Sequence, residues 1–367
     1  MSVVVITGIS NITQGIYVYA VSQRYLSTVQ ENLNYKQYVV DSNLRYFKPH
    51  ATAVEATFAQ EISSSLGRSK KFISPKFFYD MRGSDLFEQI CLLPEYYPTR
   101  TEVSILKKMG NDLAAHVKSD TRLVELGSGS SVKTRILLDV FSRVQDSTEY
   151  IPIDISEILA ESSELLLRDY TALSITGIMD SYEGGLEFLK QYDSRQNLII
   201  FLGSSFGNFS PEYGHLFLQK MRSAMKPGDL FLIGLDLVKD RDVLESAYDD
   251  SQGVTAQFNL NVLLRINAEL GADFDLGNFE HCSVYDAENQ RIEMHVRSLA
   301  DQMVMISKSG LRLELQKGEM IHTEYSHKYS LPQIGCMLRD AGLEVVRTWT
   351  DEKEMFSLTL ARRPART

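Results

Sequence analysis

From residue 122 onward, short runs of β-branched and apolar residues alternate with longer amphipathic stretches. Helical patterns at 131–143, 156–170, 184–191 and 210–225 separate the runs RLVEL, YIPID, LSITGIMD, NLIIFLG and DLFLIGLD. Such alternation is typical of βαβ units, in which a parallel sheet carries helices on both faces. The pattern therefore predicts an α/β fold.

The last forty residues predict an extension of this sheet. The segment LPQIGCMLRDAGL has a helical pattern, with Ser330 as its N-cap and Gly342 near its end. Two strand-like runs, EVVRTWT and MFSLTLAR, follow it and are joined by DEKE. We expect these two strands to form an antiparallel hairpin that pairs with the sheet.

Between about residues 238 and 328 the alternation of strand and helix patterns gives way to a long helical pattern followed by five strand-like runs. This change predicts an inserted α+β lobe. Residues 1–100 do not continue the βαβ series either, so we expect them to pack with the insertion. The predicted division is 1–100, then a main domain of 101–237 and 329–367, with 238–328 as the inserted lobe.

A glycine turn, ELGSGSSVKTR, joins the first strand of the series to its helix. Gly127 and Gly129 stand where the chain must turn tightly and let a ligand approach the backbone. Asp154 ends the next strand, where it can accept ribose hydroxyls, and Asp180 ends the following strand, where it can meet an adenine. The third glycine of a dinucleotide fingerprint is missing, because position 132 is Val.

An E-x-G-x-G turn followed by a strand that ends in Asp is the arrangement of class I S-adenosylmethionine methyltransferases. We therefore predict a mostly parallel, Rossmann-like sheet that binds S-adenosylmethionine, and a nicotinamide enzyme is the alternative. A second glycine pattern, from Gly8 to Gly15, echoes short-chain dehydrogenases but lacks a βαβ series after it. We give it no weight.

Composition narrows the class of protein further. The 367 residues carry a formal charge of -10, which gives little electrostatic support for nucleic-acid binding. Three scattered cysteines, Cys91, Cys282 and Cys336, indicate reduced thiols, and no histidine spacing indicates a metal site. The apolar N-terminal stretch is interrupted by polar residues and lacks a basic start, so it fits neither a signal peptide nor a membrane span. We expect a cytoplasmic monomer.

Seven longer motifs resemble the histidine-specific methyltransferase family of ergothioneine biosynthesis, in the family's order from about residue 70 to 363. They are FFYDMRGSDLFEQICLLPEYYPTRTE, LVELGSGSSVKTR, FLGSSFGNFSP, LIGLDLVKD, AYDDSQGVTAQFN, RIEMHVRS and HTEYSHKY. The resemblance implies methylation of the α-amino nitrogen of L-histidine, up to the trimethylated betaine hercynine.

The resemblance also implies the site residues. The cofactor residues that it implies are Tyr79, Gly127, Lys133, Asp154 and Asp180. The histidine site that it implies consists of Tyr96, Gly203, Asn208, Tyr248, Met294, Glu324 and Ser326. Within these sets, Tyr96, Asn208 and Tyr248 would hold the amino-acid backbone, Glu324 and Ser326 would hold the imidazole, and Tyr79 and Asn208 are the candidate catalytic residues.

The residues support part of this assignment by themselves. In IHTEYSHKY the period of two places His322, Glu324 and Ser326 on one face, so a carboxylate and a hydroxyl can address the two nitrogens of an imidazole. Met294 can pack against the ring or belong to an ordinary core. Thr99 and Glu102 have the spacing of a capping box and are expected to be structural.

Two alternatives stay open. The first is an N-methyltransferase for another aromatic amino acid, such as tyrosine or a tryptophan derivative. Glu324 argues against it, because an unpaired carboxylate buried against an indole or phenol ring costs several kcal/mol. The second is a catalytically silent protein that binds the cofactor and regulates a partner.

Overall fold

The computed structural model describes residues 35–50, 57–129, 131–156, 158–192 and 194–364. The glycine pattern at Gly8 and Gly15 lies outside these residues. Within them, the main sheet has nine strands in the order β1-β2-β5-β4-β3-β6-β7-β14-β13. In chain order these are β1 (Tyr35–Val39), β2 (Leu44–Pro49), β3 (Arg122–Leu126), β4 (Thr148–Ile153), β5 (Leu173–Ile178), β6 (Asn197–Phe201), β7 (Leu230–Asp236), β13 (Glu344–Thr350) and β14 (Phe356–Arg362).

The sheet is parallel from β2 to β7, and the C-terminal hairpin is antiparallel. β14 pairs antiparallel with both β7 and β13. The predicted α/β fold, its parallel series and its terminal hairpin are therefore confirmed, and the order is that of a class I methyltransferase sheet with two strands added at one edge. Because the central strands are parallel, the loops after β3, β4, β5, β6 and β7 all lie at one edge of the sheet.

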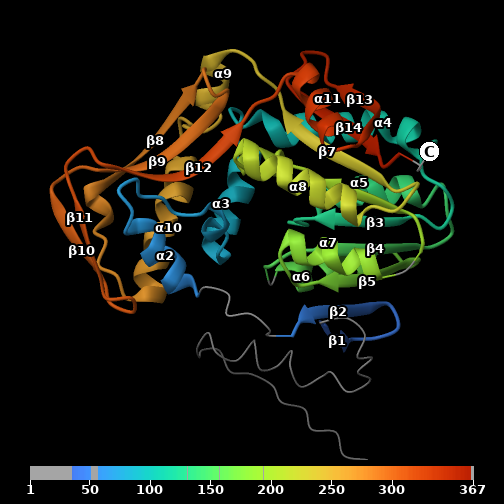
Figure 1. Cartoon of the computed structure of the whole chain (residues 1–367), viewed down its shortest axis with the longest axis horizontal. Helices are drawn as coiled ribbons and strands as arrows, with labels where there is room; N and C mark the ends of the chain where they lie inside the picture. The colour runs from blue at the N-terminus through green and yellow to red at the C-terminus, as the bar shows by residue number, and fades with distance from the viewer. Residues whose placement is uncertain (1–34, 51–56, 130, 157, 193, 365–367) are drawn as a thin grey trace, which may run out of the picture.

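Helices cover both faces of the sheet (Figure 1). One face packs against α4 (Tyr97–Ala114), α5 (Val132–Phe141) and α6 (Ile158–Asp169). The other face packs against α7 (Tyr182–Gln191), α8 (Pro211–Ala224) and α11 (Leu331–Asp340). Buried residues of β3 alternate between the two cores, since Leu123 belongs to the first and Val124 to the second. As predicted, Ser330 caps α11.

A second body of structure, at the left in Figure 1, contains most of the inserted segment. A three-stranded sheet has the order β12-β9-β8, and a separate two-stranded sheet pairs β10 with β11. We call this body the lobe. Its strands and helices are α9 (Arg241–Ser246), α10 (Val254–Leu270), η3 (Leu276–Asn278), β8 (Phe279–Asp286), β9 (Arg291–Ser298), β10 (Gln302–Ile306), β11 (Leu311–Leu315) and β12 (Met320–His327).

The N-terminal part of the chain divides between the two bodies. From it, α2 (Phe58–Leu66), η1 (Pro75–Phe78) and α3 (Met81–Leu92) share one core with α10 and the lobe's strands. We expected all of residues 1–100 to pack there, but β2 pairs in parallel with β5 and carries β1 to the edge of the main sheet. This pairing buries alternate side chains of β2, including Leu44 and Tyr46, in the sheet's core.

Candidate active site

The glycine turn after β3 has the backbone that the sequence predicts. Gly127 and Gly129 have φ angles of 76° and 47°, and a Cβ on Gly129 would meet nothing within 4 Å. The side-chain hydroxyls of Ser128 and Ser131 are buried and have no hydrogen-bond partner among the described residues. Open backbone and unpaired hydroxyls on one turn provide polar atoms for a ligand.

Asp154 faces this turn from the end of β4. One carboxylate oxygen accepts a hydrogen bond from the backbone N–H of Ser128 at 3.1 Å, and the other accepts one from Ser156 at 2.8 Å. Burial raises the pKa of Asp154 despite these bonds. A carboxylate beside this open turn can also accept a hydrogen bond from a ribose hydroxyl.

Asp180 lies at the end of β5, on the same edge of the sheet. Its carboxylate accepts hydrogen bonds from the backbone N–H of Ser181 and from the hydroxyl of Tyr35 on β1. The added N-terminal hairpin thus reaches a predicted cofactor residue.

Lys133 on α5 and Gly203 after β6 both contact Glu102, which sequence reasoning assigned to a capping box. Glu102 is fully buried, and its carboxylate accepts hydrogen bonds from Lys133 Nζ and from the backbone N–H of Gly203, each at 2.9 Å. Burial lowers the pKa of Lys133, but Glu102 outweighs it and the pKa is raised. Glu102 therefore joins a predicted cofactor residue to a predicted substrate residue.

The predicted capping box at Thr99 and Glu102 is wrong. Helix α4 begins at Tyr97 with Pro98 in its first turn, three residues earlier than the box requires, and no side chain caps it. Thr99 donates instead to the sulfur of Cys91. No sequence signal marked Glu102, because the burial of a glutamate on the first turns of a helix cannot be read from the sequence.

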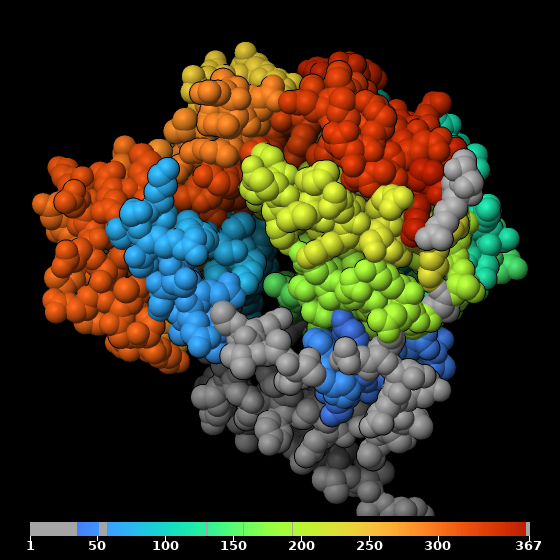
Figure 2. Space-filling view, in the orientation of Figure 1, coloured from blue at the N-terminus to red at the C-terminus, as the bar shows by residue number. Residues whose placement is uncertain are grey.

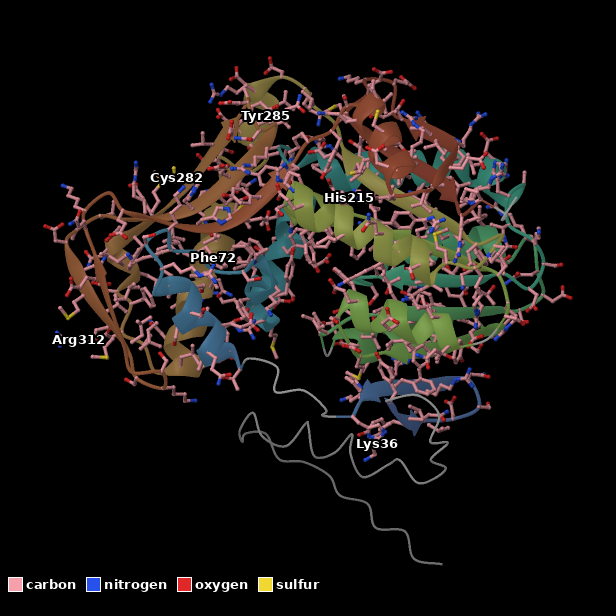
Figure 3. The ribbon with its side chains drawn as sticks, in the orientation of Figure 1. Lys36, Phe72, His215, Cys282, Tyr285 and Arg312 are labelled. Carbon is pink, nitrogen blue, oxygen red and sulfur yellow. The ribbon has the colours of Figure 1, made fainter. Side chains whose placement is uncertain are left out.

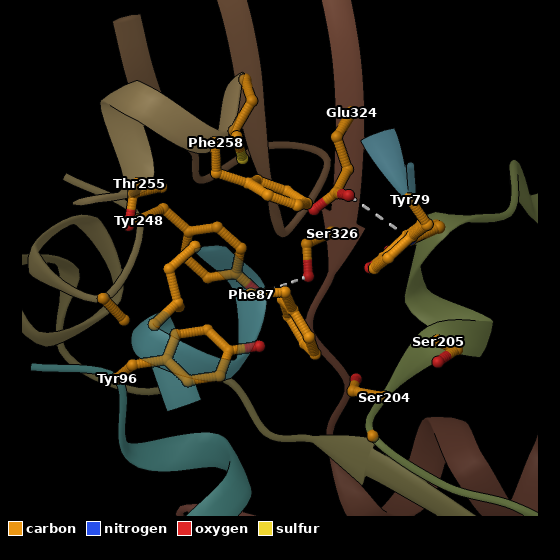
Figure 4. A pocket seen from close by; sticks show the side chains of 15 residues that line it. Tyr79, Phe87, Tyr96, Ser204, Ser205, Tyr248, Thr255, Phe258, Glu324 and Ser326 are labelled. Atoms are coloured by element: carbon orange, nitrogen blue, oxygen red, sulfur yellow. Dashed lines mark hydrogen bonds between the residues drawn. The ribbon is translucent and has the colours of Figure 1, made fainter. Parts of the chain in front are cut away.

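A cavity between the lobe and the edge of the sheet collects all the predicted substrate residues (Figure 4). In Figure 2 the surface is hollowed where the blue N-terminal segment that packs against the lobe approaches the green helices of the main domain. The cavity is lined by Tyr79, Phe87, Ile90, Tyr96, Gly203, Ser204, Ser205, Asn208, Ala247, Tyr248, Thr255, Phe258, Met294, Glu324 and Ser326. Tyr79, predicted as a cofactor residue, is among them. Asn208 ends η2 (Ser205–Asn208), just after β6.

Several aromatic rings line this cavity (Figure 4). The ring of Tyr96 lies edge-on to Tyr248 with centroids 6.1 Å apart, and Tyr79 lies edge-on to Phe258 at 5.8 Å. Tyr96 is buried, whereas Tyr79 is 40% exposed and stands at the mouth. The rings give the cavity apolar walls around a few polar groups, as is common in sites for small ligands.

Strand β12 presents Glu324 and Ser326 to the cavity but turns His322 away. The register against β9 shifts between His322 and Glu324, which makes Thr323 the extra residue of a bulge. Glu324 pairs with Met294 on the cavity face, whereas the ring of His322 stacks on Tyr325 on the other face, with centroids 3.8 Å apart. The prediction that His322 shares the face of Glu324 and Ser326 is wrong for this reason.

Glu324 is the acidic group of the cavity. Burial raises its pKa from 4.5 to about 7, while the charge of Lys328 acts in the opposite direction. The side-chain amide of Asn208 donates to its carboxylate at 3.5 Å. A carboxylate with so few protein partners can accept a hydrogen bond from a ligand.

Ser326 and Tyr248 form a hydroxyl pair that a buried lysine supports. Their oxygens are 2.7 Å apart, and Lys328 Nζ donates to Tyr248 at 2.9 Å and to Ser326 at 2.8 Å. Lys328 also pairs with Asp236 at 2.8 Å, and neither side chain is more than 1% exposed. The resemblance implied that Tyr248 holds the amino-acid backbone, but here its hydroxyl contacts the predicted ring residue.

Sequence reasoning missed Lys328 and Asp236. Asp236 ends β7 at the edge where Asp154 and Asp180 lie, and that position was a usable signal. Lys328 follows Ser326 by two residues, so the period of two places it on the same side of the chain as Ser326.

Elsewhere in the described part of the chain, the cysteines form no disulfide and the acidic and histidine side chains form no metal-binding cluster. The cysteines are free thiols, and Cys282 lies on the lobe, away from the main sheet (Figure 3). No group of three or more His, Cys, Asp or Glu side chains among the described residues could hold a metal ion. Among these same residues, no helix has the length and apolar character needed to cross a membrane.

Comparisons with known proteins agree with this geometry. A family model described as "Histidine-specific methyltransferase, SAM-dependent" matches residues 58–363. Histidine N-alpha-methyltransferase of Mycobacterium tuberculosis is 41% identical over 303 residues, which cover 82% of this chain and 94% of that protein. The protein of the same name from Mycolicibacterium smegmatis is 40% identical, over 85% of this chain and 96% of its own length.

A fungal relative covers more of the chain but is much longer. Ergothioneine biosynthesis protein 1 of Neurospora crassa is 31% identical over 94% of this chain, which corresponds to 38% of that protein. The chain belongs to the S-adenosylmethionine-dependent, histidine-specific methyltransferase family.

Proposed function

We propose that the protein methylates the α-amino nitrogen of L-histidine, in up to three rounds that end in hercynine, as part of ergothioneine biosynthesis. The observation that carries this proposal is that Glu324 and Ser326 lie on one face of β12 and line the same cavity. The cavity also borders the edge of the sheet where the predicted cofactor residues lie. An ionised carboxylate accepts an N–H, and a hydroxyl can donate to the other ring nitrogen.

The residues at the sheet edge fit S-adenosylmethionine. Asp154 offers acceptors for the ribose, and the open turn at Gly129 leaves room for the ligand beside the backbone. We propose Asp180 for the adenine, and Lys133 for the carboxylate of the methionine part, because Lys133 is the cation nearest to Gly203. When bound, this cofactor supplies a methyl group that is already activated by a positively charged sulfur.

The chain's task is then to align a neutral amine with the methyl group. We propose that Tyr96 and Asn208 hold the amino-acid backbone and that Tyr79, at the mouth, faces the reacting nitrogen. In each round the nitrogen lone pair forms the new N–C bond as the S–C bond breaks, and the proton of the ammonium must leave before the next round. Glu324 lies at the ring end and takes no part in that step.

Incubation with S-adenosylmethionine and each of the twenty amino acids, followed by mass spectrometry, tests the proposal. We expect histidine alone to gain one to three methyl groups. Methylation of tyrosine or tryptophan, with histidine left unmodified, would instead support the alternative of an N-methyltransferase for another aromatic amino acid. Binding of the cofactor without turnover of any amino acid would support a regulatory protein.

We further propose that residues 238–328, with the helices of residues 57–93, form the substrate half of a monomeric enzyme of the cytoplasm. Their shared core and the lobe's share of the cavity lining support this division. Light scattering of the purified protein tests the oligomeric state, and fractionation of the source cells tests the location.

A further inference from the structure

The ammonium of Lys328 is buried and has three acceptors. Its nitrogen lies 2.8 Å from Asp236 Oδ2, 2.9 Å from the Tyr248 hydroxyl and 2.8 Å from Ser326 Oγ. A lysine ammonium carries three hydrogens and no lone pair, so these three contacts account for all of its hydrogens. Both hydroxyls must therefore accept from Lys328.

The charge of the neighbouring Asp236 carboxylate keeps Lys328 protonated. Burial lowers its pKa, but the neighbouring Asp236 carboxylate outweighs that effect and the pKa is raised above its ordinary value. Asp236 is in turn held by Lys239 Nζ at 2.6 Å and by the Tyr97 hydroxyl at 2.7 Å. The raised pKa keeps Lys328 protonated, and therefore a hydrogen-bond donor, at neutral pH.

This donor restricts what the hydroxyl pair can offer to a ligand. The oxygens of Tyr248 and Ser326 are 2.7 Å apart, so one donates to the other. The distance alone allows either direction. A phenol is a much stronger acid than an alcohol and is the better donor, which favours Tyr248 as the donor and Ser326 as the acceptor. Ser326 then accepts from both Lys328 and Tyr248, has no lone pair left, and points its own hydrogen into the cavity.

We propose that Lys328 is a positioning residue that makes Ser326 a donor only, so that the site accepts a ring with one N–H, for Glu324, and one unprotonated nitrogen, for Ser326. This inference rests on the proposed function and deepens it: the selected ligand is a neutral azole, because an imidazolium or a pyrrole offers no acceptor to Ser326. Lys328 itself does not line the cavity, and it acts through the two hydroxyls.

Two variants separate this role from a structural one. Lys328→Met removes the donor at similar volume and returns a lone pair to Ser326. Lys239→Met is the matched control, because Lys239 pairs with the same Asp236 carboxylate but donates no hydrogen bond to Ser326 or Tyr248. The substrates are histidine and the two pyrrolylalanines, in which one ring nitrogen of histidine is replaced by C–H.

We expect the wild-type enzyme to prefer histidine over the better pyrrolylalanine in kcat/KM by about tenfold or more, the effect of one hydrogen bond. In Lys328→Met this preference should fall by about tenfold, mainly through KM for the amino acid and with KM for S-adenosylmethionine unchanged. In Lys239→Met the preference should stay as in the wild type.

Equal changes in both variants, or an unchanged preference in Lys328→Met, would overturn the proposal. If Lys328→Met does not fold, the wild-type measurement decides, because nearly equal use of histidine and a pyrrolylalanine is incompatible with a donor-only Ser326. Failure of the proposed function looks different: histidine itself would gain no methyl groups in the wild type.

Discussion

Replacing Glu324 by glutamine is expected to stabilise the folded protein at alkaline pH while it impairs the use of histidine. The carboxyl group is buried in the cavity wall, and burial raises its pKa from 4.5 to about 7. An unfolded chain releases this proton near 4.5, so between the two values the folded state binds more protons than the unfolded state. The free energy of unfolding therefore falls as the pH rises through this window.

The size of the effect follows from the two pKa values. They differ by roughly 2.5 pH units, and at about 1.4 kcal/mol per unit the ionised carboxylate destabilises the fold by about 3 kcal/mol above pH 7. Glutamine has nearly the same shape and no charge to bury. Glu324→Gln should therefore be more stable than the wild type by up to about 3 kcal/mol at pH 8, and equally stable near pH 4.

Urea denaturation of both proteins between pH 4 and pH 8.5, without ligands, measures this difference. Glu319→Gln is a control of opposite sign, because Glu319 pairs with Lys71 and its pKa is lowered, so that variant should lose stability at pH 8. In activity assays, KM for histidine should rise about 10- to 100-fold in Glu324→Gln, the effect of losing a charge-assisted hydrogen bond. A stability difference that is the same at pH 4 and pH 8 would refute the reasoning.

Two further variants test the cofactor side. Glu102→Gln should lower the free energy of unfolding by about 3 kcal/mol and weaken binding of S-adenosylhomocysteine in calorimetry, because it breaks a buried pair with Lys133; Glu352→Gln, which breaks an exposed pair with Lys108, should change neither quantity. Gly127→Ala should lower stability by about 1–2 kcal/mol and also weaken cofactor binding, since φ is 76° and its Cβ would lie 3.0 Å from the Tyr182 hydroxyl. Gly310→Ala, at φ 68° with open space around it, should show only the loss of stability, and a cofactor affinity that falls equally in both glycine variants would contradict this account.

The sequence predicts the central sheet well because its signals are local. Each strand from β3 to β7 is a short apolar run followed by an amphipathic helix, and right-handed βαβ connections leave few ways to arrange them. The candidate cofactor residues at the strand ends, Gly127, Asp154 and Asp180, follow from that arrangement. The residues of the histidine site came instead from the resemblance, and the structure brings all seven of them to one cavity.

The features that sequence reasoning missed or misassigned all depend on contacts between residues that are distant along the chain. Pairing of β2 with β5 joins positions about 130 residues apart, as at Arg45 and Thr176, and no pattern within β2 indicates its partner. Glu102 has the spacing of a cap, but its carboxylate is drawn to Lys133 and to the backbone of Gly203. The bulge at Thr323 is set by the register against β9, which alternation along one strand cannot reveal.

That bulge also prevents one of the protein's own side chains from occupying the substrate site. In a regular strand, the imidazole of His322 would face the cavity two residues before Glu324. A side chain tethered so close has an effective concentration of roughly millimolar or more, and a free histidine would have to displace it. Because Thr323 is accommodated in a bulge, the ring of His322 stacks on Tyr325 on the opposite face. The bulged backbone thus keeps the protein's own histidine from acting as a competitive inhibitor.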